Sequence, residues 1–455
     1  MSNTNENKMG VMPENKLLIS MSLPIMISMI VQALYNIVDS VFVSRVSQDA
    51  LTAVSLAFPI QTLMIAVSVG TCVGISALIS MFLGRKEFDS ANNTAKNGIF
   101  LCILSSIVFM IFGAFFAERF FAVQITDPKD IEIIRHGKAY LSICCIFCLP
   151  SFGQVLFERL LSSTGKTIYT MCSQGVGAIV NIILDPIFIF GVKALGIPAM
   201  GAGGAAIATV AGQLVACILA LTLNIKFNHE ISLNMKGFRP SLKIIKRIYA
   251  IGVPSIVMQS IGSIMTFGFN KILLGFESTA ATVFGVYFKL NSFAFMPLMG
   301  LNNGMVPIIA YNYGAGHKSR IIKTIKLSCT YGIIIMICCC LAFQLIPEQL
   351  LSIFDADANM IAIGVPALRI IGTSFLFAGY CIVISSVFQA LGSAHYSMIV
   401  SIARQLVVLL PVAYLLSRTG KLEMVWYSYP IAEIASLIIS TIFFIKIYKN
   451  TIKNL

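Results

Sequence analysis

The chain has 455 residues, of which 57% are hydrophobic and only 11% charged, and its mean hydropathy is +0.88. Soluble globular proteins carry about 25% charged residues, so this composition excludes a soluble protein and predicts a polytopic helical membrane protein. The formal net charge of +13 does not indicate nucleic-acid binding, because the basic residues gather in short connections between apolar segments.

Runs of about 20 or more mainly apolar residues, bounded by charged or turn residues, predict membrane-spanning helices. The first six predicted spans are 17–43, 51–83, 95–116, 137–160, 167–191 and 203–225. The second six are 245–274, 280–312, 322–345, 361–391, 396–417 and 425–448. The sequence therefore predicts an all-α membrane protein with twelve spans.

The longest connection, 226–244, separates an N-terminal six-helix bundle at 17–225 from a C-terminal six-helix bundle at 245–448. Tails at 1–16 and 449–455 complete the chain. Lys and Arg are concentrated in this connection and on its side of the membrane, whereas Asp355 and Asp357 make one loop on the opposite side acidic. The positive-inside rule therefore predicts that both tails and the connection are cytoplasmic.

Six helices in each half make the halves parallel repeats. At an ungapped offset of 230 residues, Pro24 aligns with Pro254 and Gly74 with Gly304. Two pseudo-symmetric bundles that enclose a central cavity are a common plan for transporters. The aligned glycines are expected either at close helix contacts or at points of bending, and the sequence leaves both interpretations open.

Two carboxylates lie inside apolar spans. Asp39 is near the end of the first span in ALYNIVDSVFV, and Asp185 lies in VGAIVNIILDPIFIF, about one helical turn after Asn181. An acid at membrane depth costs at least about 2.5 kcal/mol, so such residues usually face a bundle interior or a wet cavity and mark an ion or substrate path. Asp39, Asp185 and Thr209 lie at comparable depths in the outer halves of their spans, so they can meet.

These segments resemble bacterial multidrug and toxic compound extrusion (MATE) transporters, of the branch of MepA-type and DinF-type pumps. The resemblance covers all twelve spans and rests on YNIVDSVFV, GAIVNIILDPIFIFG, GAGGAAIAT and FMPLMGLNNGMVPIIAYNYGAG. In DinF-like relatives a cation site uses an aspartate in span one, an asparagine and an aspartate in span five, and a threonine in span six. The resemblance thus implies a coupling site for H⁺ or Na⁺ at Asp39, Asn181, Asp185 and Thr209.

Simpler roles stay open for these residues. The two acids could be structural groups bonded to hydroxyls or backbone, Asn181 could make a plain interhelical hydrogen bond, and Thr209 could bond to its own helix. The NorM-like branch instead uses acids in spans seven and ten. Here span seven offers only Gln259 and Asn270, which argues for coupling in the N-terminal half.

Other polar and aromatic residues are candidates for a substrate cavity. In the N-terminal bundle they are Gln32, Tyr35, Asn36, Phe58, Gln154 and Phe157, although aromatic residues at helical spacing also simply pack. Lys289, well inside the eighth span, is expected either as a cavity charge or as a snorkelling residue. Arg404 lies nearer the end of its span and is expected to have a structural or a snorkelling role.

The acidic, aromatic-bearing cavity and the resemblance together predict efflux of lipophilic cationic drugs across the bacterial cytoplasmic membrane. The drug would be exchanged for H⁺ and/or Na⁺ by alternating access of the two bundles. The protein is expected to function as a monomer surrounded by lipid and to need no cofactor. The alternative is a flippase for a lipid-linked saccharide from the same superfamily, which would need cavity arginines to hold pyrophosphate. An enzyme is not expected, because no HExxH or GxxxxGK[ST] motif occurs and the histidines lie at or near span ends.

Overall fold

The structure, a computed structural model, describes residues 7–46, 48–124, 131–192, 196–354 and 356–455. Residues 1–6 of the predicted N-terminal tail and Asp355 of the predicted acidic loop lie outside these ranges. The described chain is helical, and its one strand-like pairing is an isolated bridge between Val192 and Ile197. Ten of its helices are long and apolar enough to cross a membrane, and two bent helix pairs raise the number of spans to as many as twelve. The predicted all-α polytopic fold is therefore confirmed.

The chain divides into two compact units. We call residues 27–83 and 87–248 the N-terminal unit, and residues 1–26, 84–86 and 249–455 the C-terminal unit. The chain passes into the N-terminal unit within α2 (Glu14–Ser44) and leaves it within α10 (Leu242–Leu273).

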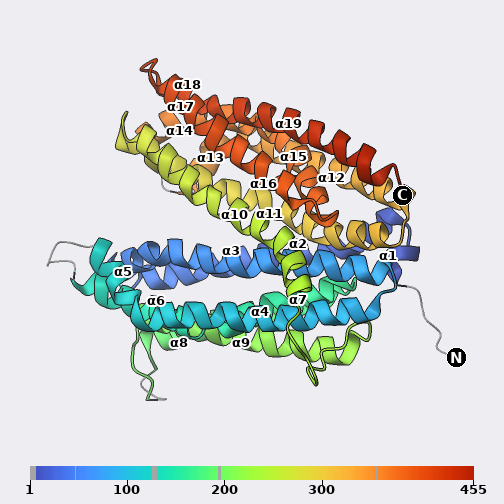
Figure 1. Cartoon of the computed structure of the whole chain (residues 1–455). Coiled ribbons are helices and arrows are strands. Elements are labelled where there is room, and N and C mark those ends of the chain that lie inside the picture. The colour runs from blue at the N-terminus through green and yellow to red at the C-terminus, as the bar shows by residue number, and fades with distance from the viewer. Residues whose placement is uncertain (1–6, 47, 125–130, 193–195, 355) are drawn as a thin grey trace. The chain divides into compact units, whose positions relative to one another are not determined.

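The other helices of the N-terminal unit run from blue to green in Figure 1. They are α3 (Gln48–Gly84), α4 (Phe88–Phe115), α5 (Ala117–Gln124), α6 (Ile131–Ile146), α7 (Leu149–Ser163), α8 (Thr167–Phe190) and α9 (Ala202–Phe227). Helix α9 packs against α6, α7 and α8 in this unit.

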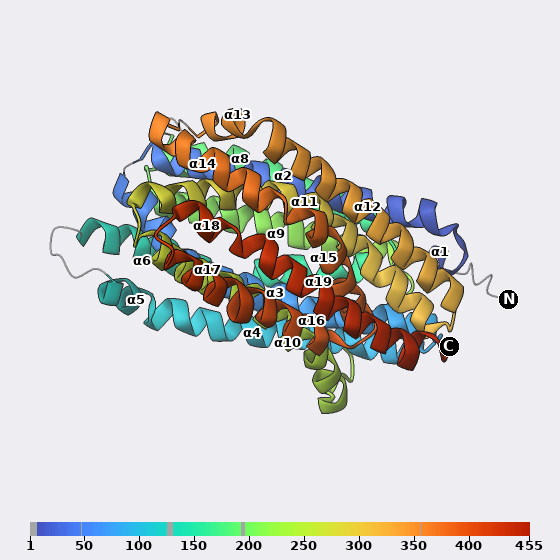
Figure 2. The same cartoon turned by 90° about the horizontal axis from the view of Figure 1, so that it is seen from above.

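The C-terminal unit begins with the short α1 (Lys8–Val11) and continues after α10. Its helices are α11 (Ser278–Gly314), α12 (Lys318–Leu345), α13 (Pro347–Ser352), α14 (Ala358–Gly372), α15 (Phe375–Ala390), α16 (Ala394–Ile402), η3 (Ala403–Leu409), α17 (Leu410–Ser417), α18 (Leu422–Trp426), α19 (Ser428–Ile447) and η4 (Tyr448–Ile452). Helix α15 packs against α11, α12 and α19, and these helices can be followed in Figure 2.

The fourth and tenth spans, expected to be continuous, are bent. The chain turns by 46° between α6 and α7 and by 50° between α14 and α15. At the first bend, a proline in the first turn of α7 fits a new helix start, because proline has no N–H to leave unbonded. At the second, the hydroxyls of Thr373 and Ser374 donate to the carbonyls of Ile370 and Ile371 and compete with backbone bonding. The bends occur in corresponding spans of the two repeats.

Glycines of α11 allow close contact with α2 inside the C-terminal unit. A Cβ atom on Gly304 would lie 2.8 Å from the Cα atom of Ser22, and one on Gly300 would lie 2.6 Å from the Cα atom of Met26. Ser22 Oγ also donates a hydrogen bond of 3.2 Å to the Leu301 carbonyl. The close-packing interpretation of Gly304 is therefore confirmed.

Candidate functional site

Small residues bring α8 and α9 into close contact. A Cβ atom on Gly212 of α9 would lie 2.7 Å from the Gly177 carbonyl oxygen and 3.0 Å from the Cβ atom of Asn181 on α8. Only glycine fits so close to a neighbouring backbone. The two helices lie side by side in Figure 1, so a polar side chain on the facing stripe of α8 can reach α9 directly.

Asn181 is the residue that crosses this interface. Its Nδ2 atom donates to Asp185 Oδ1 and to Thr209 Oγ1, each at 3.4 Å. Asn181 is 2% exposed and Asp185 is fully buried. Asp39 of α2 lies within electrostatic range of Asp185. The structure thus places the four predicted residues together, and we call them the acidic cluster.

Three oxygen atoms of the acidic cluster are buried without a hydrogen-bond donor from any described residue. They are Asp39 Oδ1, Asn181 Oδ1 and Asp185 Oδ2. None of the ion pairs formed by the described residues involves either aspartate. Leaving such a group unsatisfied costs about 1–3 kcal/mol, and more when it is charged. Carboxylate, amide and hydroxyl oxygens are the ligands that hard cations prefer, so this set fits Na⁺ as well as H⁺.

Two tyrosines adjoin the acidic cluster. Tyr35 of α2 shares a hydrogen bond with Gln32 and lies within electrostatic range of Asp39 and Asp185. Tyr140 of α6 interacts electrostatically with Asp39, and its hydroxyl accepts a hydrogen bond of 2.9 Å from Gln61 Nε2. Gln61 and Tyr140 were not predicted, although each is a polar side chain within an apolar run.

The remaining predicted cavity residues are placed as follows. Asn36 is exposed, and Phe58 is 62% exposed on α3. Gln154 and Phe157 are half-buried on α7, where Gln154 hydrogen-bonds to Glu158. Lys289 belongs to the C-terminal unit, is exposed, and places Nζ 5.7 Å from the centroid of the Phe354 ring.

The sequence model of the MatE family matches residues 24–187 and 254–415. The chain belongs to the MATE family. The two matched segments begin at Pro24 and Pro254, the pair that the repeat offset aligns, as expected for an internal repeat. The family is one of transporters.

Curated relatives span nearly the whole of this MATE chain. The multidrug export protein MepA of Staphylococcus haemolyticus is 26% identical over 421 residues, which cover 92% of this chain and 90% of the relative. MepA of Staphylococcus aureus (strain bovine RF122 / ET3-1) is 24% identical over 424 residues, with 92% and 91% coverage. An outward-facing structure of a multidrug resistance MATE transporter of the MOP superfamily superposes with a TM-score of 0.91 at 23% identity, covering both chains completely. This MATE chain therefore has the fold of these transporters.

A further buried acid in the N-terminal unit of this MATE chain was missed from the sequence. Glu158 of α7 is 4% exposed. Its Oε1 atom accepts from Gln154 Nε2 at 3.1 Å and from Ser173 Oγ at 3.0 Å, and its Oε2 atom accepts from Gln174 Nε2 at 2.7 Å. Glu158 lies near the predicted end of its span, where a charged residue is usually solvated, so the sequence did not distinguish it.

The C-terminal unit of this MATE chain also contains a buried acid that was missed. Glu433 of α19 is 6% exposed, and its Oε2 atom lies 3.2 Å from Nη1 of Arg404. Arg404 lies in η3, which is a π-helix. Pro411 follows and has no N–H for the Val407 carbonyl, which favours such a departure from α-helix. The ion pair with Glu433 agrees with the expected structural role of Arg404.

Proposed function

We propose that this protein exports lipophilic cations with aromatic rings in exchange for H⁺ and/or Na⁺, which bind at the acidic cluster. The observation that carries the proposal is the set of three buried oxygens without donors, on Asp39, Asn181 and Asp185. A proton or a sodium ion would reduce the negative charge of this set, and a buried site that is stabilised by a bound cation can respond to an ion gradient. The relatives named MepA are multidrug export proteins, which supports drugs as the exported class.

Drug and ion compete in this mechanism. An ion that binds from outside occupies the carboxylates of Asp39 and Asp185, and the positive charge of the drug is no longer attracted there. The drug can be driven out only because its binding is weaker in the ion-loaded state than in the empty state. Asp39 is carried by α2, so its neutralisation repacks or bends this helix. Alternating access then follows from the two-bundle plan.

The same proposal places the protein in the bacterial cytoplasmic membrane, as a monomeric transporter without a cofactor and without enzymatic activity. The distribution of basic residues supports both termini and the connection 226–244 on the cytoplasmic side. A membrane-impermeant thiol reagent applied to intact cells should label Asn359→Cys and spare Ser241→Cys. Labelling of Ser241→Cys alone would show that the orientation is inverted.

Reconstituted protein tests the transport proposal directly. Proteoliposomes loaded with a cationic dye such as ethidium should release it when an inward pH gradient or an inward sodium gradient is imposed separately. Release under one gradient alone would identify the coupling ion. If no compound from a broad cationic panel is exported by correctly inserted protein, drug export is wrong. Movement of a lipid-linked saccharide in the same vesicles would then favour the flippase alternative.

A further inference from the structure

We propose that Glu158 forms a second proton-binding site in the N-terminal unit, separate from the acidic cluster. This inference rests on the proposed exchange for H⁺ and deepens it. Glu158 is buried between α7 and α8, and its three hydrogen-bond partners Gln154, Ser173 and Gln174 are all neutral donors. A buried acid held by neutral donors can exist in either charge state if its partners can adapt.

Gln174 provides this adaptation. Its Nε2 atom donates to Glu158 at 2.7 Å, while its Oε1 atom is buried without a hydrogen-bond partner among the described residues. A half-turn of the amide exchanges donor and acceptor, so the neutral acid could donate its own proton to Gln174 Oε1. The pocket therefore has hydrogen-bonding partners for both the carboxylate and the carboxylic acid.

Charged and titratable groups reach Glu158 from several packed elements. Arg159 is its neighbour on α7, Cys72 interacts with it from α3, Cys217 from α9 and Tyr35 from α2. From α8 the groups that face it are Ser173 and Gln174, which do not titrate near neutral pH. Arg159 is the one cation in this set, and it attracts the charged form of Glu158.

One buried stripe of α8 connects Glu158 to the acidic cluster. Buried residues along this stripe include Ser173, Gly177, Asn181 and Asp185. At 1.5 Å per residue, Ser173 and Asp185 lie about 18 Å apart along the helix. Tyr35 lies within electrostatic range of Glu158 as well as of Asp39 and Asp185. Glu158 thus shares the electrostatic environment of the cluster but titrates at its own site: an O–H bond forms at Glu158 when a proton is taken from a hydronium ion, which becomes water, and the same bond breaks when the proton returns to water.

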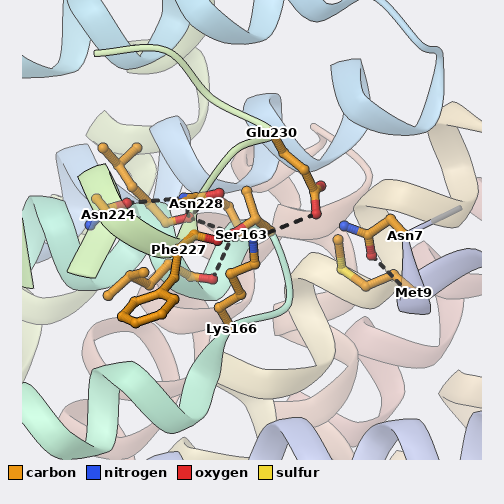
Figure 3. Close-up of polar contacts among 11 residues, drawn as sticks. Asn7, Met9, Ser163, Lys166, Asn224, Phe227, Asn228 and Glu230 are labelled. Carbon is orange, nitrogen blue, oxygen red and sulfur yellow. Dashed lines mark hydrogen bonds and ion pairs between the residues drawn. The ribbon is translucent and has the colours of Figure 1, made fainter. Parts of the chain in front are cut away.

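The backbone around Glu158 is fixed by the end of α9. Asn224 Nδ2 donates to the Phe157 carbonyl at 2.8 Å, and Asn228 Nδ2 donates to the Leu160 carbonyl at 3.4 Å. Figure 3 shows Asn224 and Asn228 beside Lys166, which binds Glu230 and the Phe227 carbonyl. Partial burial lowers the pKa of the Lys166 ammonium, and Glu230 counteracts this shift. The backbone on both sides of Glu158 is therefore held by α9, and its buried side chain is positioned toward α8.

Infrared spectra of the purified full-length protein across a pH series test the inference. A protonated carboxyl group has its own carbonyl stretching band, and wild-type protein should show a component that Glu158→Gln lacks. If both proteins have the same protonated carboxyl band at every pH, the inference is overturned, because a carboxylate that only links α7 to α8 stays charged and contributes nothing to that band. Glu158→Gln should also lose export driven by a pH gradient but keep binding of tetraphenylphosphonium. Lost binding with unchanged spectra would instead make Glu158 a substrate site.

Gln174→Leu supplies a second variant that keeps the acid. It removes a donor to the charged form, so the Glu158 component should persist to higher pH, and an unchanged pH course would contradict the inference even if Glu158→Gln does not fold. Asp39→Asn separates the two proposals. If Asp39→Asn exports at the wild-type rate while Glu158→Gln lacks its infrared component, the acidic cluster is not the coupling site, and the assignment of Glu158 still holds.

Discussion

In the N-terminal unit, Asp39 and Asp185 form no ion pair with any described residue, whereas in the C-terminal unit the buried acid Glu433 lies 3.2 Å from Arg404. Asp185 of α8 and Glu433 of α19 each lie in an apolar span, one in each repeat. An acid already neutralised by arginine gains little from binding an ion, because the ion would have to displace the guanidinium. An unpaired acid gains a great deal. The two units thus differ in whether a buried acid has a cationic partner, which is the difference expected if only the N-terminal unit binds the coupling ion, as proposed above.

The largest loss of export is expected when either carboxylate of the acidic cluster is removed. Asp39→Asn and Asp185→Asn should each abolish gradient-driven dye export, since an amide binds neither a proton nor a sodium ion with the strength of a carboxylate. Export is measured in proteoliposomes under the same imposed gradient. Folding of each variant is checked by its size-exclusion profile in detergent before reconstitution. Glu433→Gln is the control in the other unit and should still export, because the glutamine keeps an oxygen that can accept the hydrogen bond from Arg404. Wild-type rates from both aspartate variants would exclude the acidic cluster as the coupling site.

The second effect concerns the paired acid. Arg404→Met leaves Glu433 buried without its partner, which should cost about 3–5 kcal/mol of stability. Thermal unfolding of the protein in detergent should show a large fall in the transition temperature. The double variant Arg404→Met with Glu433→Leu should recover most of it, because no uncompensated charge remains. A double variant as unstable as the single one would mean that the arginine stabilises by packing and not by charge.

A smaller effect should follow from the helix contact that assembles the acidic cluster. A methyl group at Gly212 would lie 2.7 Å from the Gly177 carbonyl oxygen, so Gly212→Ala should force α8 and α9 apart at a cost of about 1–3 kcal/mol. Ion affinity should fall with it, since Asn181 and Thr209 would separate. Gly175→Ala on α8 is the matched control, because a methyl group there meets nothing within 4 Å. Equal stability of the two variants would show that the interface yields easily.

The sequence was sufficient for the spans and for the acidic cluster, but not for the bends or for two of the buried acids. The fifth span was predicted at 167–191 and is Thr167–Phe190, because hydropathy changes sharply at its ends. A bend leaves hydropathy unchanged, so the break before α7 gave no such signal. Asp185 stood out as a charge deep in an apolar run. Glu158 is recognised as buried only through Ser173 and Gln174, which another helix brings to it.

The smallest loss of export is expected for the hydroxyl of the acidic cluster, on Thr209. Thr209→Ala removes one acceptor of Asn181 Nδ2, at 3.4 Å, but leaves both carboxylates and the bond from Asn181 to Asp185. A single neutral hydrogen bond contributes about 1 kcal/mol, so ion affinity should fall about fivefold, with export slowed and not abolished. The measurement is the half-saturating proton or sodium concentration for dye export. Thr209→Ser, which keeps the hydroxyl, should restore the wild-type value. If Thr209→Ala abolishes export as completely as Asp185→Asn while Thr209→Ser is normal, the hydroxyl is an essential ligand of the ion, and the contribution assigned here to the carboxylates alone is too large.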